Sequence, residues 1–343
     1  MIGRGQIIYD RTGTRKVWLG LSEQSLISLL AHRVLTLVFP YPILPSFASS
    51  VYQVRFIRDE GAMKRHMGYD HRRHAGNAGD LWKHLVLAET AGCIFEAGIQ
   101  VYVESHAGHP EYALSPGGEW EGGIGRLWPH REELARYSYF QILEDLNPAG
   151  LERYPGSASI VIEIAKRRGI NLRVDLWDTS PEVERAWRSG EKGQSLEDLH
   201  IHIGDGFSGA RKLTRELDEP ALLLVDSPYL AESDAVQVEE LISRSAEAGW
   251  IVLSWQMIGL ERRPRPACKF LEFDLRFEEA GLVCGPWVGA TMILAWEGDL
   301  HPDQKVDGLL ERLGGIEEEF LKIRGPKSES FYPRDPPGGG FRR

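Results

Sequence analysis

The stretch ALLLVDSPYL, residues 221–230, runs from five apolar residues straight into an acid, a serine, a proline and a tyrosine. The apolar run does not alternate and is too short to cross a membrane, so it predicts a strand buried on both faces of a parallel sheet. Asp226 then follows the carboxyl end of that strand. Ligands of open α/β sheets bind at this end, where the order of the strands reverses. The stretch therefore predicts a type of sheet and, in Asp226, a candidate site residue.

The regions around this strand repeat the pattern. A helix is expected over residues 80–96, where apolar side chains recur at three- and four-residue spacing and form one buried stripe. Further strands are predicted at 99–105, 171–178, 199–206 and 250–255, and helices at 181–188, 209–217 and 236–248. Strands that alternate with helices predict right-handed crossovers and a doubly wound parallel sheet.

The last two predicted strands are arranged differently. Segments 269–277 and 290–297 follow each other with no helix between them, and the first alternates apolar and polar residues. They predict an antiparallel pair that closes one edge of the sheet. A mostly parallel sheet with one reversed strand is typical of class I, Rossmann-like methyltransferases, so this α/β fold is expected by analogy.

The composition is that of an ordinary soluble protein. The 343 residues are 42 % hydrophobic and 26 % charged, which is enough to bury a large core. A formal net charge of −10 argues against a protein that binds nucleic acid non-specifically, although it is compatible with a local basic patch. The three cysteines form no CxxC pair, which argues against a disulfide framework and a structural zinc. We therefore expect a cytoplasmic protein without a metal.

The two ends of the chain differ from the region between them. Residues 1–62 do not follow the pattern of strands and helices and are expected to be a poorly ordered extension; a targeting segment is the alternative. The apolar run 26–48 carries a histidine and an arginine in its middle and prolines after them, so we expect no membrane span. Residues 301–343 are expected to form a C-terminal helix and a disordered tail.

The α/β domain is expected over residues 63–300. Within it, residues 112–157 interrupt the alternation of strands and helices. Two helices are predicted there, at 118–128 and 130–146. The segment is therefore expected to be a small helical subdomain inserted after the first strand.

Three more loops follow predicted strands: Glu104-Ser105-His106-Ala107-Gly108, Asp178, and Asp205-Gly206. In a doubly wound fold such acids commonly bind ribose hydroxyls or the edge of an adenine. The first loop has no GxGxxG pattern and carries His109 and Pro110 where a dinucleotide-binding loop needs glycine. S-adenosylmethionine has no pyrophosphate and demands less of that loop, so it is favoured over NAD. Each acid alone is more often a turn former or a helix cap.

Asp226-Ser227-Pro228-Tyr229 differs by one residue from the Asp-Pro-Pro-Tyr motif of amino-group methyltransferases. An adenine amine is a poor nucleophile because its lone pair is delocalised into the ring. A carboxylate and the following backbone carbonyl can accept its two N–H bonds and draw the nitrogen toward tetrahedral geometry, while Tyr229 stacks on the base. Ser227 still supplies that carbonyl and lacks only the rigidity of proline. The alternative is a turn that merely ends the strand.

The stretch YDHRRHAGNAGDLWKH, residues 69–84, carries the most specific pattern of the chain. It resembles the pattern Tyr-x-His-x-x-His-Ala-Gly-Asn-x-x-Asp-x-x-Lys-His of the RlmJ-type family of 23S rRNA adenine-N6 methyltransferases. Further matches follow in the family's order: HAG at 106–108, GEWEGGIGRLW at 118–128, YPGS at 154–157, DGF at 205–207 and DSPY at 226–229. The resemblance spans residues 67–297.

This resemblance implies roles for the matching residues. Asp226 would be the catalytic acceptor of the target amine, and Lys83 would belong, with Tyr69 and His71, to an N-terminal cap that closes the site on the base. The implied S-adenosylmethionine contacts are His84, His106, Ser157, Asp178, Asp205 and Gly206. The implied substrate contacts are Ser227, Pro228 and Tyr229.

Two departures from the family pattern affect what is expected. The family's Asp-Thr-His-Ala-Gly-Ala-Gly is Glu-Ser-His-Ala-Gly-His-Pro at 104–110, and its Asp-Pro-Pro-Tyr is Asp-Ser-Pro-Tyr. The expected function is methyl transfer from S-adenosylmethionine to the N6 amine of an adenine in 23S rRNA, by a monomer that needs no metal and no membrane. The alternatives are an amino methyltransferase acting on DNA or a small heterocycle, and a non-catalytic relative that binds RNA or S-adenosylmethionine.

Overall fold

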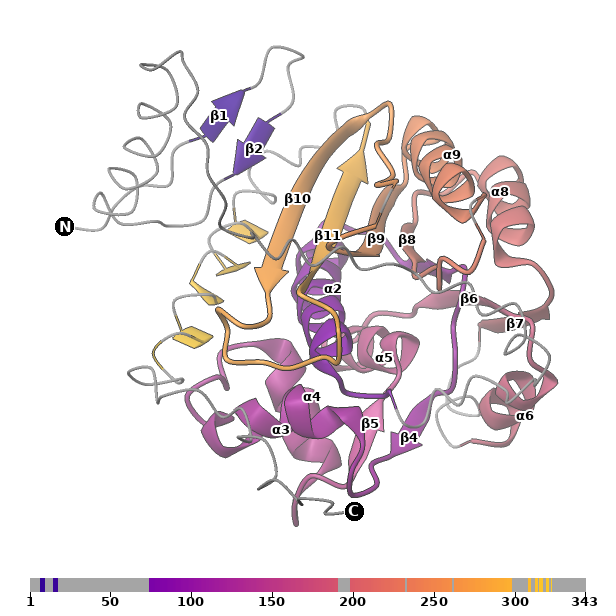
Figure 1. The fold of residues 1–343 in the computed structure, drawn as a ribbon. Helices are drawn as coiled ribbons and strands as arrows, with labels where there is room; N and C mark the ends of the chain where they lie inside the picture. Colours follow the sequence, from indigo (N-terminus) through magenta and orange to yellow (C-terminus); the bar gives the residue numbers. More distant parts are fainter. Residues whose placement is uncertain are drawn as a thin grey trace, which may run out of the picture.

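The computed structural model describes residues 7–9, 15–17, 74–190, 198–231, 233–260, 262–297 and scattered positions between 308 and 322. A seven-stranded sheet lies at its centre (Figure 1). The strands of this sheet are β3 (Val101–Glu104), β6 (Arg173–Asp178), β7 (Leu199–Ile203), β8 (Leu222–Val225), β9 (Ile251–Met257), β10 (Lys269–Arg276) and β11 (Gly289–Trp296). Their order across the sheet is β10-β11-β9-β8-β3-β6-β7.

The pairing of the strands confirms the predicted sheet. β8 pairs in parallel with β3 and with β9, and the parallel pairing continues from β3 through β6 to β7. β11 runs antiparallel to β9 and to β10, so it is the reversed strand of this sheet. The antiparallel pair closes one edge, as predicted. The strand order reverses between β3 and β8, which places the carboxyl ends of these strands at the crevice where such sheets bind ligands.

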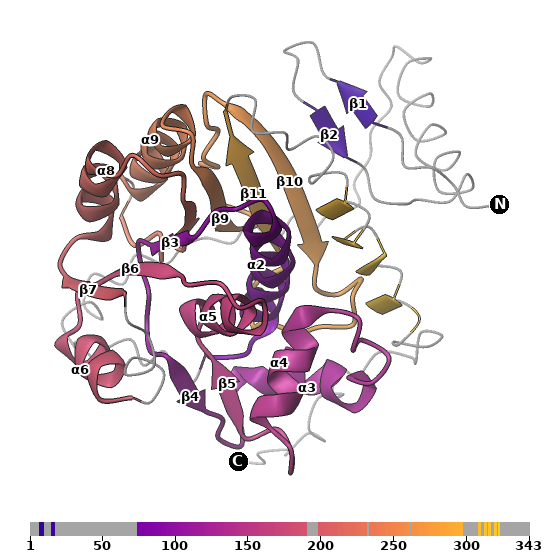
Figure 2. The same cartoon turned by 180° about the vertical axis from the view of Figure 1, so that it is seen from behind.

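Helices cover both faces of the sheet. One face carries α2 (Ala78–Glu96), α5 (Ser157–Arg167) and α6 (Pro181–Ser189), and the other carries α8 (Gly206–Glu216) and α9 (Asp234–Glu247) (Figures 1 and 2). Four of these helices agree with predicted ones to within a few residues at each end. α5 has no counterpart among the predicted helices, because its β-branched residues Ile160, Val161, Ile162 and Ile164 favour a strand by local preference. Packing against α2 overrides that preference.

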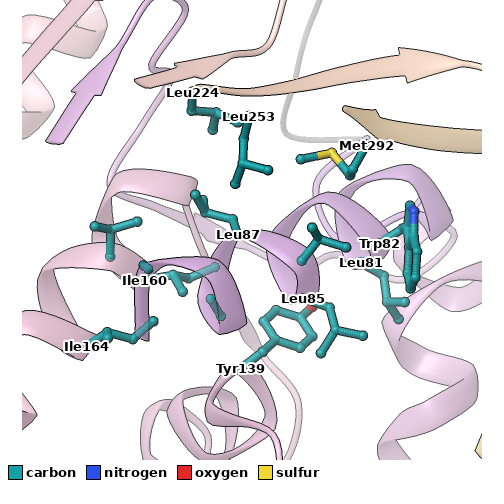
Figure 3. Close-up of a cluster of buried hydrophobic side chains, with 14 of the residues drawn as sticks. Leu81, Trp82, Leu85, Leu87, Tyr139, Ile160, Ile164, Leu224, Leu253 and Met292 are labelled. Carbon is teal, nitrogen blue, oxygen red and sulfur yellow. The ribbon is translucent and has the colours of Figure 1, made fainter. Parts of the chain in front are cut away.

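α2 is buried on nearly all sides rather than along the single stripe that its sequence predicts. The sheet covers one side of it, and α4 (Ser138–Leu146) and α5 cover others. Figure 3 shows Leu85 and Leu87 of α2 between Tyr139, Ile160 and Leu253. Several polar residues of α2 are therefore buried as well: Asp80, Lys83, His84, Glu89 and Thr90. Burying such groups is costly unless each finds a partner, so their contacts decide the local structure.

The described positions between 308 and 322 also join this core. Most of them are helical, and Leu309, Leu313, Ile316 and Phe320 are buried at helical spacing. The Arg312 guanidinium donates a hydrogen bond to the Glu89 carboxylate on α2 (3.0 Å). This ion pair compensates a carboxylate that is otherwise buried in the core.

The segment 112–157 is less helical than its sequence predicts. Its helices are α3 (Ile124–Leu127) and α4; the 3-10 turn η3 (Glu119–Gly122) precedes α3, and η4 (Trp128–His130) follows it. Glycines at 118, 122, 123 and 125 and the proline at 129 explain why the first predicted helix is reduced to short turns. Two short strands that have no predicted counterpart, β4 (Glu111–Ala113) and β5 (Arg153–Pro155), pair antiparallel and bring the two ends of the segment together.

Before residue 74 the structure describes two short strands. β1 (Ile7–Tyr9) and β2 (Arg15–Val17) pair antiparallel, and β2 lies near β10 (Figure 1). The rest of the predicted extension lies outside the described residues. Within the described part of the chain, none of the helices combines the length and the apolar character that a membrane crossing requires.

The contact between the insertion and α2 gives a prediction for Gly123. A Cβ at Gly123 would lie 2.3 Å from the carbonyl oxygen of Gly76, directly before α2. We expect Gly123→Ala to lower the free energy of unfolding by about 1–3 kcal/mol, because the two backbones would have to separate. Urea denaturation measures this loss. Gly308→Ala is the control that should cost nothing, since a Cβ there would meet no atom within 4 Å; equal midpoints for both variants would contradict the close contact.

Candidate active site

The start of α2 is fixed by side chains of its own first turn. Asn77 caps the helix, since its Oδ1 accepts a hydrogen bond from the backbone N–H of Asp80 (2.9 Å). The Asp80 carboxylate accepts a hydrogen bond from the backbone N–H of Gly76 through Oδ2 (3.1 Å). Gly76 has a φ of +77°, which glycine adopts without steric cost. Part of the motif at 74–80 is thus explained by the geometry of a helix start.

Glu119, at the start of η3, joins this helix start to the insertion. Its Oε1 forms a hydrogen bond with Nδ1 of His74 (2.8 Å), and its Oε2 accepts a hydrogen bond from the Asn77 side chain (3.0 Å). Glu119 and Asn77 are 42 positions apart in the sequence. Their contact connects two of the motifs that the sequence shows as separate stretches.

Lys83 lies one turn further along α2 and reaches the end of β8. Its Nζ lies 2.6 Å from Oδ2 of Asp226 and 2.9 Å from Oδ1 of Asp80. The side chains of Lys83, Asp80 and Asp226 are only 6 %, 10 % and 18 % exposed. Burial alone would lower the pKa of Lys83, but the charges and hydrogen bonds of the two carboxylates outweigh burial and raise it above its ordinary value. Lys83 is therefore a buried ammonium shared by two carboxylates.

The loop after β8 is held by hydrogen bonds. Ser227 is buried, and its Oγ accepts a hydrogen bond from the backbone N–H of Tyr229 (3.3 Å). The Tyr229 hydroxyl donates to the backbone carbonyl of Trp255 in β9 (3.2 Å). Tyr229 has a φ of +50°, a strained conformation for a bulky residue, and such strain is concentrated at functional sites. Pro228, between these two residues, is exposed. The Ser227 hydroxyl thus stabilises the turn through a hydrogen bond. In the Asp-Pro-Pro-Tyr motif a proline ring at this position would restrict the backbone instead.

The loops after β3, β6 and β7 meet at the carboxyl ends of the parallel strands, here called the carboxyl edge of the sheet. The backbone N–H of Gly108 donates a hydrogen bond to Oδ2 of Asp178 (3.0 Å), which ties the β3 loop to the end of β6. A Cβ at Gly206 would lie 1.6 Å from the carbonyl oxygen of Ser105, so only glycine allows the start of α8 to approach the β3 loop this closely. The loops therefore form one connected surface.

The imidazole of His106 lies among the carboxylates of this edge. Burial lowers the pKa of His106, and the negative charges of Asp226, Asp205 and Asp178 oppose that shift. Three acids that follow three different strands are thus within electrostatic reach of one side chain. Burial would raise the pKa of Asp205, but hydrogen bonds from the first turn of α8, which it caps, outweigh burial and lower it. Asp205 is therefore a carboxylate and a helix cap at once.

Ser157 and Glu104 form a buried pair below this edge. The Ser157 hydroxyl donates a hydrogen bond to Oε1 of Glu104, and the Tyr102 hydroxyl donates to Oε2 (2.8 Å). Glu104 is completely buried, and burial raises its pKa to about 8 although both hydrogen bonds favour the ionised form. Ser157 begins α5, so Glu104 links the start of that helix to the carboxyl end of β3.

His84 is held in a second buried polar group. Its Nδ1 forms a hydrogen bond with the Tyr154 hydroxyl (3.0 Å), and that hydroxyl also contacts the Tyr139 hydroxyl (2.9 Å). The rings of His84 and Tyr154 are stacked. Tyr154 belongs to the YPGS stretch, so the contact joins that stretch to the motif at 69–84.

The structure brings most of the candidate residues to one region. Lys83 and Asp226 are in direct contact, and His84 follows Lys83 within α2. The negative charges of Asp226, Asp205 and Asp178 all act on His106. Tyr69 and His71 lie outside the described residues. Three residues join the site although the family resemblance assigns them no role: Asp80, Glu104 and Glu119. All three lie in stretches that the sequence marks, but Glu119 binds Asn77 from 42 positions away and Glu104 binds Ser157 from 53 positions away, so these contacts could not be predicted from local patterns.

The acceptor groups at the carboxyl edge suit a ligand that carries hydroxyl groups. Asp178 and Asp205 each accept two backbone hydrogen bonds, and a carboxylate has room for about two more. His106, with its lowered pKa, favours the neutral imidazole. Among the residues that the structure describes, no three His, Cys, Asp or Glu side chains gather as they would around a metal ion. Asp178, Asp205 and His106 are therefore the residues that could hold an organic cofactor.

Comparisons with known proteins show that the chain is similar to methyltransferases. Residues 98–261 match the family described as ribosomal RNA large subunit methyltransferase D, RlmJ. The ribosomal RNA large subunit methyltransferase J of Haemophilus influenzae is 28 % identical over 222 residues, which cover 60 % of this chain and 75 % of that protein. The protein of the same name from Escherichia coli is 26 % identical over 175 residues, which cover 49 % of this chain and 61 % of that protein.

A solved structure has the same fold. Protein LPL1258 from Legionella pneumophila superposes with a TM-score of 0.56 at 20 % sequence identity, over 71 % of this chain and 93 % of that one. The family match and the curated relatives confirm the resemblance that the motifs indicate. We therefore identify the chain as a relative of the RlmJ-type methyltransferases.

Proposed function

We propose that this methyltransferase transfers a methyl group from S-adenosylmethionine to the N6 amine of an adenine in 23S rRNA. The observation that carries the proposal is the position of Asp226 at the carboxyl end of β8, beside the point where the strand order reverses. The backbone carbonyl of Ser227 follows it directly. A carboxylate and a carbonyl in sequence offer two acceptors, which is the number that one exocyclic amine needs.

The protein's part in the reaction would be to orient the amine. One N–H would donate to the Asp226 carboxylate and the other to the Ser227 carbonyl, so that the nitrogen lone pair is turned away from the ring. Tyr229, fixed by its hydrogen bonds to Ser227 and Trp255, would stack on the base. S-adenosylmethionine would supply a methyl group already activated on a sulfonium and would leave as the neutral thioether S-adenosylhomocysteine, so positioning is the main requirement. The methylated nitrogen would give up one proton, which the Asp226 carboxylate would accept.

The cofactor would lie along the edge formed by the β3, β6 and β7 loops. Asp178 and Asp205 would accept hydrogen bonds from its hydroxyl or amino groups, and His106 would contact it as a neutral ring. Ser157 and His84, the other residues that the family resemblance implies, are held in place by Glu104 and Tyr154. The close approach of Gly206 to the β3 loop keeps Asp205 next to His106.

Relatives support ribosomal RNA as the substrate. Both curated relatives carry the name of a large-subunit ribosomal RNA methyltransferase. The net charge of −10 favours recognition of one RNA structure over general binding of nucleic acid, since an acidic surface repels phosphates except where cations are concentrated. A folded or single-stranded segment that presents one adenine is the substrate class that fits.

Asp226→Ala tests the central part of this proposal. We expect the variant to bind S-adenosylmethionine as the wild type does and to lose about 10²- to 10⁴-fold in turnover, because one acceptor of the amine is gone. Radiolabelled methyl transfer to purified rRNA, to DNA and to free adenosine, followed by nucleoside mass spectrometry, measures the rate and names the product.

Asp218→Asn is the matched control for this test. Asp218 is an exposed acid that precedes β8 and so lies at the opposite end of the same strand. Its rate should equal that of the wild type. Methylated adenine formed at an undiminished rate by Asp226→Ala would remove Asp226 from the mechanism, and a product other than N6-methyladenine would overturn the proposed target atom.

Glu104→Gln tests the buried support of Ser157 through the pH dependence of stability. The raised pKa of Glu104 means that the folded protein binds its proton more tightly than the unfolded chain does. The stability that this proton provides is complete below the ordinary value of 4.5 and is lost as the pH rises to about 8. Urea denaturation across this range should show wild type losing stability relative to Glu104→Gln. Glu132→Gln, at a side chain that is 83 % exposed, should follow the wild type; parallel curves for all three proteins would show that Glu104 is not a buried titrating group.

A further inference from the structure

Lys83 contacts two carboxylates, and the proposed reaction needs one of them. Its Nζ lies 2.6 Å from Asp226 and 2.9 Å from Asp80, in a region where all three side chains are largely buried. The contact to Asp226 uses Oδ2 of the carboxylate that would accept the adenine amine. Substrate and lysine therefore compete, at least in part, for the same group.

Releasing a buried ammonium from its partner is unfavourable. When one member of a buried ion pair loses the other, the charge that remains is neither solvated nor compensated, and the loss is typically several kcal/mol. If Asp226 were the single partner of Lys83, an incoming amine would bear that cost. The second carboxylate changes this, because the lysine can stay paired while Asp226 turns to the substrate.

Asp80 is well placed to be that second partner. It precedes Lys83 by one helical turn on α2, so the two side chains stay adjacent without any movement of the backbone. Its other oxygen, Oδ2, is fixed by the backbone N–H of Gly76, and its own N–H is bound by Asn77. The positive end of the helix dipole favours an ionised carboxylate in this first turn. Asp80 thus offers a fixed charge that does not depend on the substrate.

We propose that Asp80 is a positioning residue that keeps the Lys83 ammonium paired while the substrate amine takes its hydrogen bond from Asp226. The proposal rests on the proposed function and extends it by assigning a role to a residue outside the reacting groups. Asp80 acts only through Lys83. The motif spacing Asp-x-x-Lys then has a reason beyond helix capping, since it is the spacing that keeps the acid and the lysine on one helix face.

The competing explanation is that Asp80 only stabilises the start of α2, by accepting the hydrogen bond from the backbone N–H of Gly76. Asp80→Asn separates this structural role from the positioning of Lys83. The asparagine side chain keeps an oxygen that can accept from Gly76, but it lacks the charge that Lys83 needs. We expect Asp80→Asn to raise KM for the RNA roughly tenfold or more while the KM for S-adenosylmethionine stays the same. In a Lys83→Met background the same substitution should have no further effect, because the ion that Asp80 holds is gone.

Glu89→Gln is the matched control. Glu89 is another buried acid of α2, and it pairs with Arg312 and the backbone N–H of Ser138, away from Asp226. Its KM for RNA should stay at the wild-type value. An equal rise of KM in Asp80→Asn and Glu89→Gln would mean that any lost acid in α2 disturbs the site, and the proposal would fall.

A second measurement tests the sharing of the ammonium without any activity. Asp80→Asn and Asp226→Asn each leave Lys83 one carboxylate, whereas the double variant removes both. The free energy of unfolding lost by the double variant should exceed the sum of the two single losses, and Lys83→Met should restore most of the excess. Additive losses would overturn the shared ion pair.

The KM values and the free energies of unfolding test the proposed function and the positioning role of Asp80 separately. A wild-type protein that methylates no adenine in RNA would sink the proposed function, while the stability measurements would still decide whether Lys83 is shared. An active wild type whose Asp80→Asn variant has unchanged KM would sink the positioning role alone.

Discussion

A buried ammonium held between two carboxylates is the interaction on which the site depends. Lys83 reaches from α2 to the carboxyl end of β8 and so joins the helix start to the loop that carries Asp226. Charges are buried in proteins only where partners compensate them. The ion pair therefore fixes the position of α2 relative to the sheet at the point where the sheet's strand order reverses.

The burial of α2 explains why several separate stretches converge on this site. Because the helix is enclosed by the sheet, α4, α5 and the C-terminal positions, several of its polar side chains find their partners in neighbouring segments. Glu119 binds the helix start, Tyr154 binds His84, and Arg312 binds Glu89. The inserted segment is thus part of the support of the site rather than an appendage to the sheet.

The departures from the family pattern have structural consequences that differ in kind. Ser227 replaces a proline, and its hydroxyl supplies a hydrogen bond that braces the turn at Tyr229. Glu104 replaces an aspartate, and its carboxylate is bound to Ser157 and Tyr102 at full burial. The first difference keeps a loop in shape by other means, whereas the second lengthens the carboxylate side chain that Ser157 and Tyr102 bind.

The amino-acid sequence was enough to predict the parallel sheet, the antiparallel pair at its edge and the position of Asp226, because unbroken apolar runs and strand ends are local features. It also predicted α2, but as a helix with one buried stripe, and it missed α5, whose β-branched residues are buried against α2 and α4. Only the tertiary structure brought Asp80, Lys83 and Asp226 together and buried Glu104. Lys83 and Asp226 are 143 positions apart, so their pairing depends on the path of the whole chain and cannot be predicted from a local pattern.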